Sequence, residues 1–388
     1  MQSTPSMATV MKGSDTSEYP PLLDACVQRS HLVRKVGYDA QAFLAPNGGA
    51  GKGLQLRNLV GPFMESFVGF ASNTSHCSGY SLVQEGAANY RLWQQISLPI
   101  SLQRHKIDLF LAPYNNAPLL LPPRVELILV LHDTTMLKGF RKPDLRGRLV
   151  DFYTRCQIPP AVARSRVVLT VSEHSRSEIM RAFPKANVRV IPCTIDAKWF
   201  RPRPLSGREG YLLMVTSSAP HKNAWAAIEA YAHYANRARS NAIPFRIVGL
   251  SAEADSYRNR LASNGIAHLV RFMPFMPENE MRELYRGAAA VLIPSFSEGF
   301  GIPMLEGMAT GTPVLSSRAA SLPEVGGDAA FYFDPANREE ITDALETVLP
   351  DTKLREKMAG KGLVQAAIYR PDIVGRQVMA FWKEFAGV

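Results

Sequence analysis

The chain has 388 residues, a formal net charge of +10, and 46% hydrophobic and 20% charged residues. This length exceeds what one hydrophobic core usually supports, so two domains are expected. No apolar run reaches the roughly 18 to 20 residues that a membrane-spanning helix needs. The first thirty residues lack the pattern of a secretory signal, so we expect a cytoplasmic location.

The positive charge is concentrated in one half of the chain. Residues 1–205 hold 25 Lys and Arg against 14 Asp and Glu, a net charge of +11, whereas residues 206–388 hold 19 against 20. The densest basic run is Lys138–Arg148. A basic domain attracts polyanions such as nucleic acid or an anionic membrane, and a solvated basic face without a partner is the alternative.

The first half alternates short apolar runs with helix-like segments. After a flexible tail over residues 1–32, a strand is expected at Val33–Leu44, then the glycine-rich stretch Pro46–Gly53 and a helix at Leu54–Phe70. Further buried strands are expected at Ile107–Ala112, Val125–Leu131, Val167–Val171 and Val188–Ile191. This pattern predicts an α/β domain over residues 33–205.

A Pro-, Arg- and Gly-rich stretch, Cys193–Gly210, is the expected linker, and a second alternation follows it. Strands are expected at Tyr211–Val215, Phe245–Val248, Leu269–Phe272, Ala290–Ile293 and Pro313–Ser316, with helices between them. The sequence therefore predicts a second doubly wound domain over 206–370, with ligands at the carboxyl ends of the strands. A last helix over 371–388 is expected to pack back on the first domain.

The stretch from Pro294 to Pro335 carries the most informative motif. It begins PSFSEGFGIPMLE, where a strand end is followed by a glycine-flanked loop and a helix with Pro303 near its first turn. The N-terminus of such a helix offers unpaired N–H groups that can hold a diphosphate. Glu298 and Glu306 flank this helix start, so both carboxylates can bind hydroxyl groups of one ligand.

This stretch resembles the donor-binding motif of the retaining family-4 glycosyltransferases, the group 1 enzymes of the GT-B superfamily. Glu298, seven intervening residues and Glu306 match the paired glutamates of that family. The segments GTPVLS, LPEV, GDAA and DP match the family's usual continuation up to Pro335. The match is tight from Tyr211 to Pro335 and loose before His132. It implies a GT-B fold, in which two Rossmann-like doubly wound α/β domains face each other.

The resemblance also assigns roles to the residues around the motif. It implies that Glu298 contacts the hydroxyl groups of the donor sugar and that Glu306 binds the ribose. It further implies that the backbone amides of Phe300, Gly301 and Ile302 meet the sugar and the diphosphate.

A second motif, Val215–Asn223, resembles the phosphate-binding turn of the family. There Lys222 is expected to neutralise the leaving diphosphate, since a fixed cation stabilises charge that develops during the reaction. Many relatives carry an arginine where this chain has Ser217. His221, next to the lysine, is a candidate for the missing positive group.

The first domain offers weaker candidates. Gly51 and Lys52 lie in a glycine-rich turn that is not a P-loop but resembles the turn that closes over the diphosphate in the family. His132 follows a buried strand directly, and the family's histidine at this place lies against the donor sugar. Ser172 is explained equally well as a helix cap, so it is not included among the site residues.

In the second domain, Arg271 and Phe272 end a strand whose loop surrounds the nucleobase in the family. Both are therefore expected to bind the donor.

The expected reaction transfers a hexose from a nucleoside diphosphate sugar to an acceptor hydroxyl with retention at the anomeric carbon. The resemblance favours mannose from GDP-mannose. Glu298, Lys222 and His132 are the expected catalytic residues, and the leaving phosphate is expected to take the acceptor proton. No cofactor or metal is expected, because no Asp-x-Asp pair occurs and the four cysteines lack zinc-site spacing.

The basic first domain fits a glycan acceptor carried on a lipid in an anionic membrane, as in exopolysaccharide or lipopolysaccharide assembly. The enzyme would then be peripheral on the inner face of the cell membrane, and no nucleic acid partner is expected. Two alternatives stay open. One is a GT-B nucleotide-sugar epimerase, and the other is a non-catalytic nucleotide-sugar-binding module.

Overall fold

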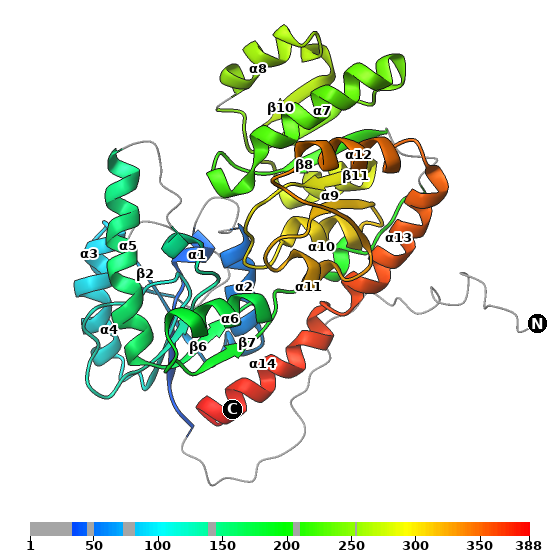
Figure 1. Ribbon diagram of the computed structural model, residues 1–388. Coiled ribbons are helices and arrows are strands. Elements are labelled where there is room, and N and C mark those ends of the chain that lie inside the picture. Colours follow the sequence, from blue (N-terminus) through cyan, green and yellow to red (C-terminus); the bar gives the residue numbers. More distant parts are fainter. Residues whose placement is uncertain (1–32, 45–49, 73–81, 139–144, 205–209, 253) are drawn as a thin grey trace, which may run out of the picture. The chain divides into compact units, whose positions relative to one another are not determined.

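The computed structural model describes residues 33–44, 50–72, 82–138, 145–204, 210–252 and 254–388 and contains two parallel β-sheets (Figure 1). The strand order is β3-β2-β1-β4-β5-β6-β7 in the first sheet and β10-β9-β8-β11-β12-β13 in the second. Parallel neighbours need crossover connections, which here are mostly helices. The chain therefore folds into two Rossmann-like α/β domains, as predicted. The basic run Lys138–Arg148 lies partly outside the described residues.

The first domain combines its sheet with helices on both faces. Its strands are β1 (Val36–Asp39), β2 (Val68–Ala71), β3 (Leu82–Gln84), β4 (Leu109–Ala112), β5 (Glu126–Val130), β6 (Ser165–Thr170) and β7 (Val188–Val190). Its helices are α1 (Gln41–Leu44), α2 (Ala50–Val60), α3 (Tyr90–Leu92), α4 (Leu98–Arg104), α5 (Leu145–Arg164) and α6 (Glu173–Ala182), and a π-helical segment, Trp93–Ser97, joins α3 to α4.

Two predicted elements in this domain are wrong in extent. The first strand ends at Asp39 and is followed by α1, instead of running to Leu44. The helix predicted to reach Phe70 ends at Val60 and gives way to a short 3-10 turn and β2. Pro62 explains this stop, because proline has no N–H to continue the helical hydrogen bonds.

The second domain follows the prediction closely. Its strands are β8 (Tyr211–Val215), β9 (Phe245–Val248), β10 (Val270–Met273), β11 (Ala288–Ile293), β12 (Val314–Ser317) and β13 (Ala330–Phe333). Its helices are α7 (Ala224–Ala238), α8 (Ala254–Ser263), α9 (Glu278–Gly287), α10 (Ile302–Ala309), α11 (Leu322–Gly326), α12 (Arg338–Val348) and α13 (Thr352–Ala367). The edge strand β13 was not predicted.

The last helix, α14 (Pro371–Ala386), belongs to the core of the first domain. Its apolar side chains, among them Val378 and Trp382, pack with residues of β1 and α2. The indole N–H of Trp382 donates to the carbonyl oxygen of Leu59 at 2.8 Å. In the described part of the chain, no helix combines the length and the apolar character needed to cross a bilayer.

Each sheet has one point where the strand order reverses, and this is where α/β proteins bind ligands. In the first sheet it lies between β1 and β4, and in the second between β8 and β11. The loops that leave β8 and β11 at their carboxyl ends contain Lys222 and Glu298. The topology therefore brings the two halves of the predicted donor site to neighbouring strands.

Candidate functional site

Lys222 and Glu298 form a charge pair at the carboxyl ends of β8 and β11. The ammonium of Lys222 donates to both carboxylate oxygens of Glu298, at 2.8 Å each. The Ser295 hydroxyl adds a hydrogen bond of 2.7 Å to one of these oxygens. The two charged side chains are only 24% and 11% exposed, so the pair is largely shielded from water.

Asn223 holds the turn of Lys222 against the loop of Glu298. Its backbone has a φ of 53°, in the left-handed region that asparagine tolerates better than most residues. Its side-chain amide donates to the carbonyl oxygens of Pro294 and Pro335, at 3.1 and 2.8 Å. The amide therefore fixes the spacing between the two charged residues.

The loop after Glu298 is so closely packed that only glycine fits at two of its positions. A Cβ at Gly299 would lie 2.8 Å from the carbonyl oxygen of His132 in the first domain. Gly301, which precedes α10, has a φ of 100°, and a Cβ there would meet Leu322 at 2.7 Å. The glycines of the predicted motif thus permit close approach of the backbone.

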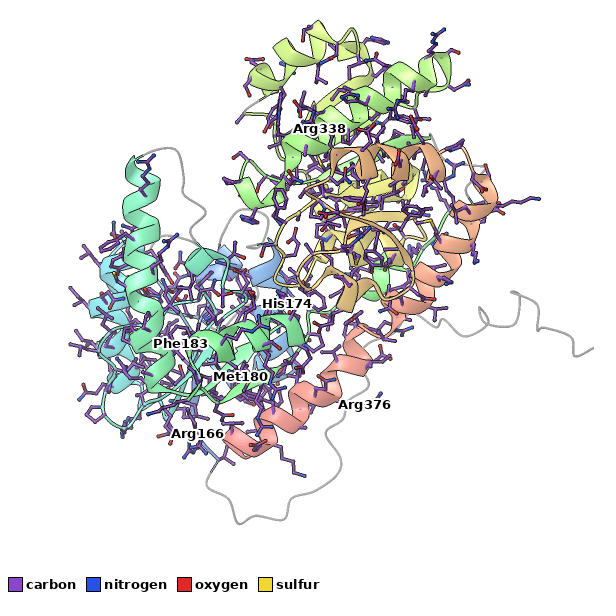
Figure 2. The ribbon with its side chains drawn as sticks, viewed as in Figure 1. Arg166, His174, Met180, Phe183, Arg338 and Arg376 are labelled. Carbon is purple, nitrogen blue, oxygen red and sulfur yellow. The ribbon has the colours of Figure 1, made fainter. Side chains whose placement is uncertain are left out.

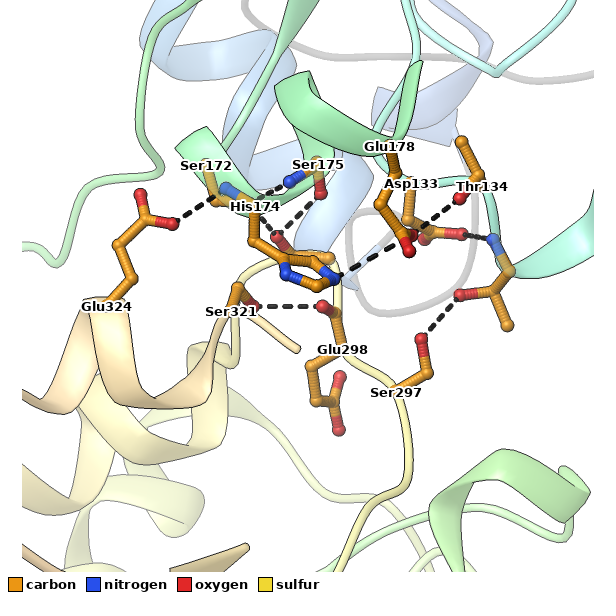
Figure 3. A network of polar contacts seen from close by, with 12 residues as sticks. Asp133, Thr134, Ser172, His174, Ser175, Glu178, Ser297, Glu298, Ser321 and Glu324 are labelled. Atoms are coloured by element: carbon orange, nitrogen blue, oxygen red, sulfur yellow. Dashed lines mark hydrogen bonds and ion pairs between the residues drawn. The ribbon is translucent and has the colours of Figure 1, made fainter. Parts of the chain in front are cut away.

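The carbonyl oxygen of Gly299 is held by two serines from the start of α6, the helix on which Figure 2 labels His174; Figure 3 shows both serines from close by. Ser172 donates to it at 2.8 Å and Ser175 at 3.2 Å. The hydroxyl of Ser172 also accepts the backbone N–H of Ser175 at 3.1 Å, so this residue caps the helix as well. The helix cap predicted for Ser172 is therefore confirmed, and the same hydroxyl also contacts the glycine loop.

Glu324 makes a reciprocal contact from the second domain. Its two carboxylate oxygens accept the backbone N–H groups of Glu173 and His174, at 2.8 and 2.9 Å. Figure 3 shows the contact with His174. A carboxylate at a helix N-terminus satisfies free donors and interacts well with the helix dipole. The contact joins the second domain to the first turn of α6.

The other side of the Glu298 loop is held by hydroxyl groups. Ser321 donates to the carbonyl oxygen of Glu298 at 2.9 Å, and Ser297 shares a hydrogen bond of 3.1 Å with Thr135 of the first domain (Figure 3). Contacts on both flanks therefore hold the loop in one conformation.

His132 is buried two residues after the end of β5, close to this loop. The pKa of His132 is lowered to about 4, first by burial and then by the positive charge of Lys52, against opposing effects of Pro113 and Asp133. The Nε2 atom lies 3.0 Å from the carbonyl oxygen of Pro113. The imidazole is therefore neutral at neutral pH, and Nε2 carries the proton if it donates to that oxygen.

The family of the chain follows from its similarity to known proteins. Residues 196–363 match the sequence profile described as "Glycosyl transferases group 1". The chain is 30% identical over 270 residues to the O-antigen chain mannosyltransferase B of Escherichia coli, covering 65% of this chain and 69% of that protein. This protein belongs to the group 1 glycosyltransferases.

Two further similarities agree with this family. The MMP alpha-(1->4)-mannosyltransferase of Mycolicibacterium hassiacum is 28% identical over 255 residues, which cover 64% of this chain and 60% of that protein. The solved structure of Anabaena Alr3699/HepE in complex with UDP and glucose has a TM-score of 0.72 at 17% identity, covering 91% of this chain and all of that one. The structural likeness shows that the fold is GT-B.

In this glycosyltransferase, Gly51 and Ile302 come from different domains and lie close together. A Cβ at Gly51 would be 3.7 Å from Cγ1 of Ile302, an ordinary van der Waals contact. Lys52 follows on the same helix, with its ammonium 5.9 Å from the centre of the Tyr114 ring. Although part of the Lys52 side chain is exposed, its ammonium is shielded, which lowers its pKa, and Asp133 opposes this shift.

Glu306 lies on α10, beyond the glycine loop. The pKa of Glu306 is raised to about 7, mainly because its carboxyl group is buried; the interaction with the Tyr285 hydroxyl opposes this shift, and the charge of Glu278 adds to it. The group is therefore close to half-ionised at neutral pH. Phe300 packs edge to face on Tyr369, with ring centres 5.4 Å apart.

His221 lies beside Lys222, and its carbonyl oxygen accepts the N–H of Phe296 at 2.8 Å. Its pKa is lowered by burial first and by the charge of Lys222 second, with Glu298 and Asp133 opposing. This shift argues against His221 as the second positive group. Ser217 lies two residues after Val215, where β8 ends.

Among the described residues, no contact links Arg271 or Phe272 to the other predicted site residues. Arg271 is exposed on β10, and the ring of Phe272 stacks on Tyr257 of α8 with ring centres 5.9 Å apart. Gly249, missed by the sequence analysis, lies nearer to the phosphate turn. It has a φ of 99°, and a Cβ there would meet the Thr216 carbonyl oxygen at 2.1 Å.

Five of the residues that sequence reasoning missed make side-chain hydrogen bonds to residues far away in the sequence: Ser175, Asn223, Ser297, Ser321 and Glu324. Two more, Asp133 and Ser295, bond to residues two and three positions away. A signal existed for two of them: Asn223 follows Lys222 in the phosphate turn, and Glu324 lies in the LPEV segment that matched the family. Among the described residues, no three His, Cys, Asp or Glu side chains form a metal-binding group.

Proposed function

We propose that this glycosyltransferase moves a hexose from a nucleoside diphosphate sugar to a hydroxyl group of a glycan acceptor, with retention at the anomeric carbon. The observation that carries the proposal is the Lys222–Glu298 pair beside the N-terminus of α10. The Lys222 cation and the N-terminus of α10 together can bind a diphosphate. The Glu298 carboxylate can accept hydrogen bonds from sugar hydroxyl groups.

In the proposed step, the bond between the anomeric carbon and the diphosphate oxygen breaks, and its electron pair leaves with the diphosphate. The acceptor oxygen bonds to the same face of the carbon, and its proton passes to the leaving phosphate. Lys222 and the α10 N-terminus stabilise the charge that develops on the phosphate, so the proposed reaction needs no metal. A retained anomeric configuration in the product would support this route.

Four further residues have proposed roles around the donor. His132, kept neutral by burial, hydrogen-bonds the sugar without adding a charge that would repel the developing oxocarbenium ion. Glu306 accepts hydrogen bonds from the ribose. Lys52, with Gly51, contacts the diphosphate.

GDP-mannose is the proposed donor. Support comes from the similarity to two mannosyltransferases of about 30% identity. The similarity to an O-antigen mannosyltransferase further supports a lipid-linked glycan acceptor in the assembly of a surface polysaccharide, with the enzyme on the inner face of the membrane.

A two-stage experiment tests these proposals. Thermal-shift measurements with GDP, UDP, ADP and dTDP identify the base, because a ligand that binds only the folded state raises the melting temperature. The matching nucleotide sugars are then incubated with and without a glycan acceptor, and the product is analysed by NMR. Acceptor-dependent α-linked product from an α-linked donor is the expected result. Interconversion of the sugar without acceptor would identify an epimerase, and binding without turnover would identify a non-catalytic module.

A further inference from the structure

The segment between β7 and β8 places an aromatic side chain in the core of the second domain. A short 3-10 turn, Ala197–Trp199, begins after Asp196, whose carboxylate accepts the N–H of Lys198 at 2.8 Å. The backbone N–H of Trp199 donates to the carbonyl oxygen of Asp196 at 3.0 Å. Trp199 is 4% exposed and belongs to the same apolar core as Tyr285 of α9. The turn therefore directs the indole ring into this core.

The same segment is tied to the second connection between the domains, where α13 continues into α14 (Figure 1). The N–H of Ile195 donates to the carbonyl oxygen of Tyr369 at 3.0 Å. The guanidinium of Arg370 lies over the ring of Phe200, 6.0 Å from its centre. These contacts lie on both sides of Trp199 in the sequence, so they fix its backbone.

Trp199 packs directly against Tyr285. The ring centres are 5.5 Å apart and the ring planes meet at 73°, the edge-to-face arrangement that aromatic pairs favour. The backbone carbonyl oxygen of Tyr285 accepts the hydroxyl of Thr312 at 2.8 Å. Both the ring and the backbone of Tyr285 are therefore held in place.

The hydroxyl of Tyr285 points to a role beyond packing. Tyr285 is fully buried, and its hydroxyl interacts with the carboxyl group of Glu306. The described residues offer this hydroxyl no other hydrogen-bond partner. A buried hydroxyl without a partner costs free energy that a phenylalanine at the same place would avoid. The carboxyl group of Glu306 therefore explains why this aromatic residue carries a hydroxyl.

We propose that Tyr285 and Trp199 are positioning residues for Glu306. The Tyr285 hydroxyl orients the carboxyl group, and the Trp199 ring keeps Tyr285 in the place that this requires. The inference rests on the proposed function for its purpose, since Glu306 is there the residue that accepts hydrogen bonds from the ribose. It connects the segment between the domains directly to the donor site. The orientation of Glu306 itself can be measured without a donor.

The interaction predicts the sign of a measurable effect. A hydroxyl that donates to a carboxylate stabilises the ionised form, so Tyr285 lowers the pKa of Glu306. Burial and the negative charge of Glu278, also on α9, raise this pKa. Removing the hydroxyl leaves the two raising effects unopposed, so Glu306 should then ionise at a higher pH.

Infrared difference spectroscopy of the ligand-free, full-length protein tests the proposal, with Glu306→Gln identifying the carboxyl band of Glu306. In Tyr285→Phe the ionisation midpoint should rise by about one pH unit. The ionised fraction at pH 7 then falls from about a half to about a tenth, so affinity for a nucleoside diphosphate should fall about fivefold. Calorimetric titration with whichever of GDP, UDP, ADP and dTDP binds the wild type measures this loss.

Trp199→Leu should also raise the midpoint, because the ring of Tyr285 loses its support. The double variant Trp199→Leu/Tyr285→Phe should have the midpoint of Tyr285→Phe alone, since Trp199 acts through the hydroxyl that is already missing. A Trp199 with a purely structural role would not show this equality. Trp199→Phe keeps an aromatic ring, so it should give a smaller rise and replaces Trp199→Leu where that variant does not fold.

The matched control is Tyr231→Phe. It also removes the hydroxyl of a buried tyrosine in the second domain, one that donates to the carbonyl oxygen of Ile243 at 2.7 Å. The ionisation midpoint of Glu306 and the nucleotide affinity at pH 7 should both match the wild type in this variant, whatever its stability.

The outcomes separate the proposal from the proposed function. An unchanged midpoint in Tyr285→Phe would overturn the positioning of Glu306, and a further rise in the double variant would overturn the role of Trp199. The expected midpoints in a protein that binds none of the four nucleoside diphosphates would contradict the proposed function and leave the positioning of Glu306 standing.

Discussion

The ammonium of Lys222 lies 2.8 Å from each carboxylate oxygen of Glu298. In this state the two residues proposed to act on the donor neutralise each other. When a donor enters, its diphosphate must replace Glu298 as the partner of Lys222. The hydroxyl groups of its sugar must replace Lys222 as the partner of Glu298. The pair therefore keeps both groups in position until the donor replaces their mutual contact.

Replacing Lys222 with Met should lower kcat by about 10²- to 10³-fold, the usual effect of removing one group that stabilises developing charge. The same change leaves Glu298 shielded and unpaired, so we also expect a loss of roughly 1–3 kcal/mol in the free energy of unfolding. In the double variant Lys222→Met/Glu298→Gln, stability should recover while activity does not. Steady-state kinetics and urea unfolding measure the two effects.

The control for this variant is Lys361→Met. Lys361 also pairs with a carboxylate, that of Asp328, but on the exposed surface of the second domain. Both its activity and its stability should stay close to those of the wild type. Equal activity losses in the two lysine variants would contradict the role proposed for Lys222.

Glu306 should make donor binding pH-dependent around pH 7. Burial raises its pKa to about 7, and the ionised carboxylate accepts hydrogen bonds from ribose hydroxyls more strongly. Between pH 6 and pH 8 its ionised fraction rises from about 10% to about 90%, so the affinity for a nucleoside diphosphate should rise up to about ninefold. Calorimetric titration with GDP at three pH values measures this, and Glu306→Gln should remove the dependence.

The raised pKa of Glu306 should also make folding stability fall with rising pH, whereas donor affinity rises. The folded-state pKa of Glu306 is raised above its ordinary value of 4.5, so the folded protein binds more protons between pH 4.5 and about 7. The contribution of Glu306 to the free energy of unfolding therefore falls as the pH rises from 4.5 to about 7. An affinity that did not change with pH while Glu306→Gln bound equally well would exclude the ribose role.

Features that depend on neighbouring residues could be predicted from the sequence, whereas contacts between distant residues could not. The strands β8 and β9 were predicted to the residue, because they are continuous apolar runs bounded by turn residues. The strand β2 was missed because its four residues, VGFA, were taken into the helix predicted to run to Phe70, although Pro62 ends that helix. The pairing of Glu298 with Lys222 could be inferred only through the family motif, since 76 residues separate the two.

The contacts of Ser172 and Glu324 show what no local pattern contains. Ser172 reaches Gly299 over 127 residues, and Glu324 reaches Glu173 over 151. Each side chain has an ordinary local explanation, a helix cap or an exposed helix-start acid. Their partners become known only when the two domains are placed together.

Glu324→Ala should impair catalysis more than folding. Its carboxylate satisfies two backbone N–H groups at the start of α6, whose serines hold the Gly299 carbonyl oxygen. Losing it should loosen the Glu298 loop and lower kcat/KM by about tenfold, mostly through kcat, as expected for a misplaced catalytic group. Glu324→Asp should restore part of the activity, which a purely structural defect would not explain.

The control is Glu346→Ala, which removes an ion pair with Arg237 on the surface of the second domain. We expect its kinetics to match the wild type. Unchanged kinetics in Glu324→Ala would show that the contact between the domains does not position the loop.

Gly299→Ala should disrupt the glycine loop, and Gly360→Ala provides its matched control. A Cβ at Gly299 would lie 2.8 Å from the backbone carbonyl oxygen of His132, which cannot rotate away as a flexible side chain can. The loop and β5 would have to separate, so we expect kcat to fall at least about tenfold and stability by about 1–3 kcal/mol. Gly360 is inside α13 with no atom within 4 Å of a Cβ, so alanine there should stabilise the helix by roughly 0.5–1 kcal/mol. Kinetics and urea unfolding of the two variants compare the same added methyl group, and equal behaviour would refute the close approach of Gly299 to His132.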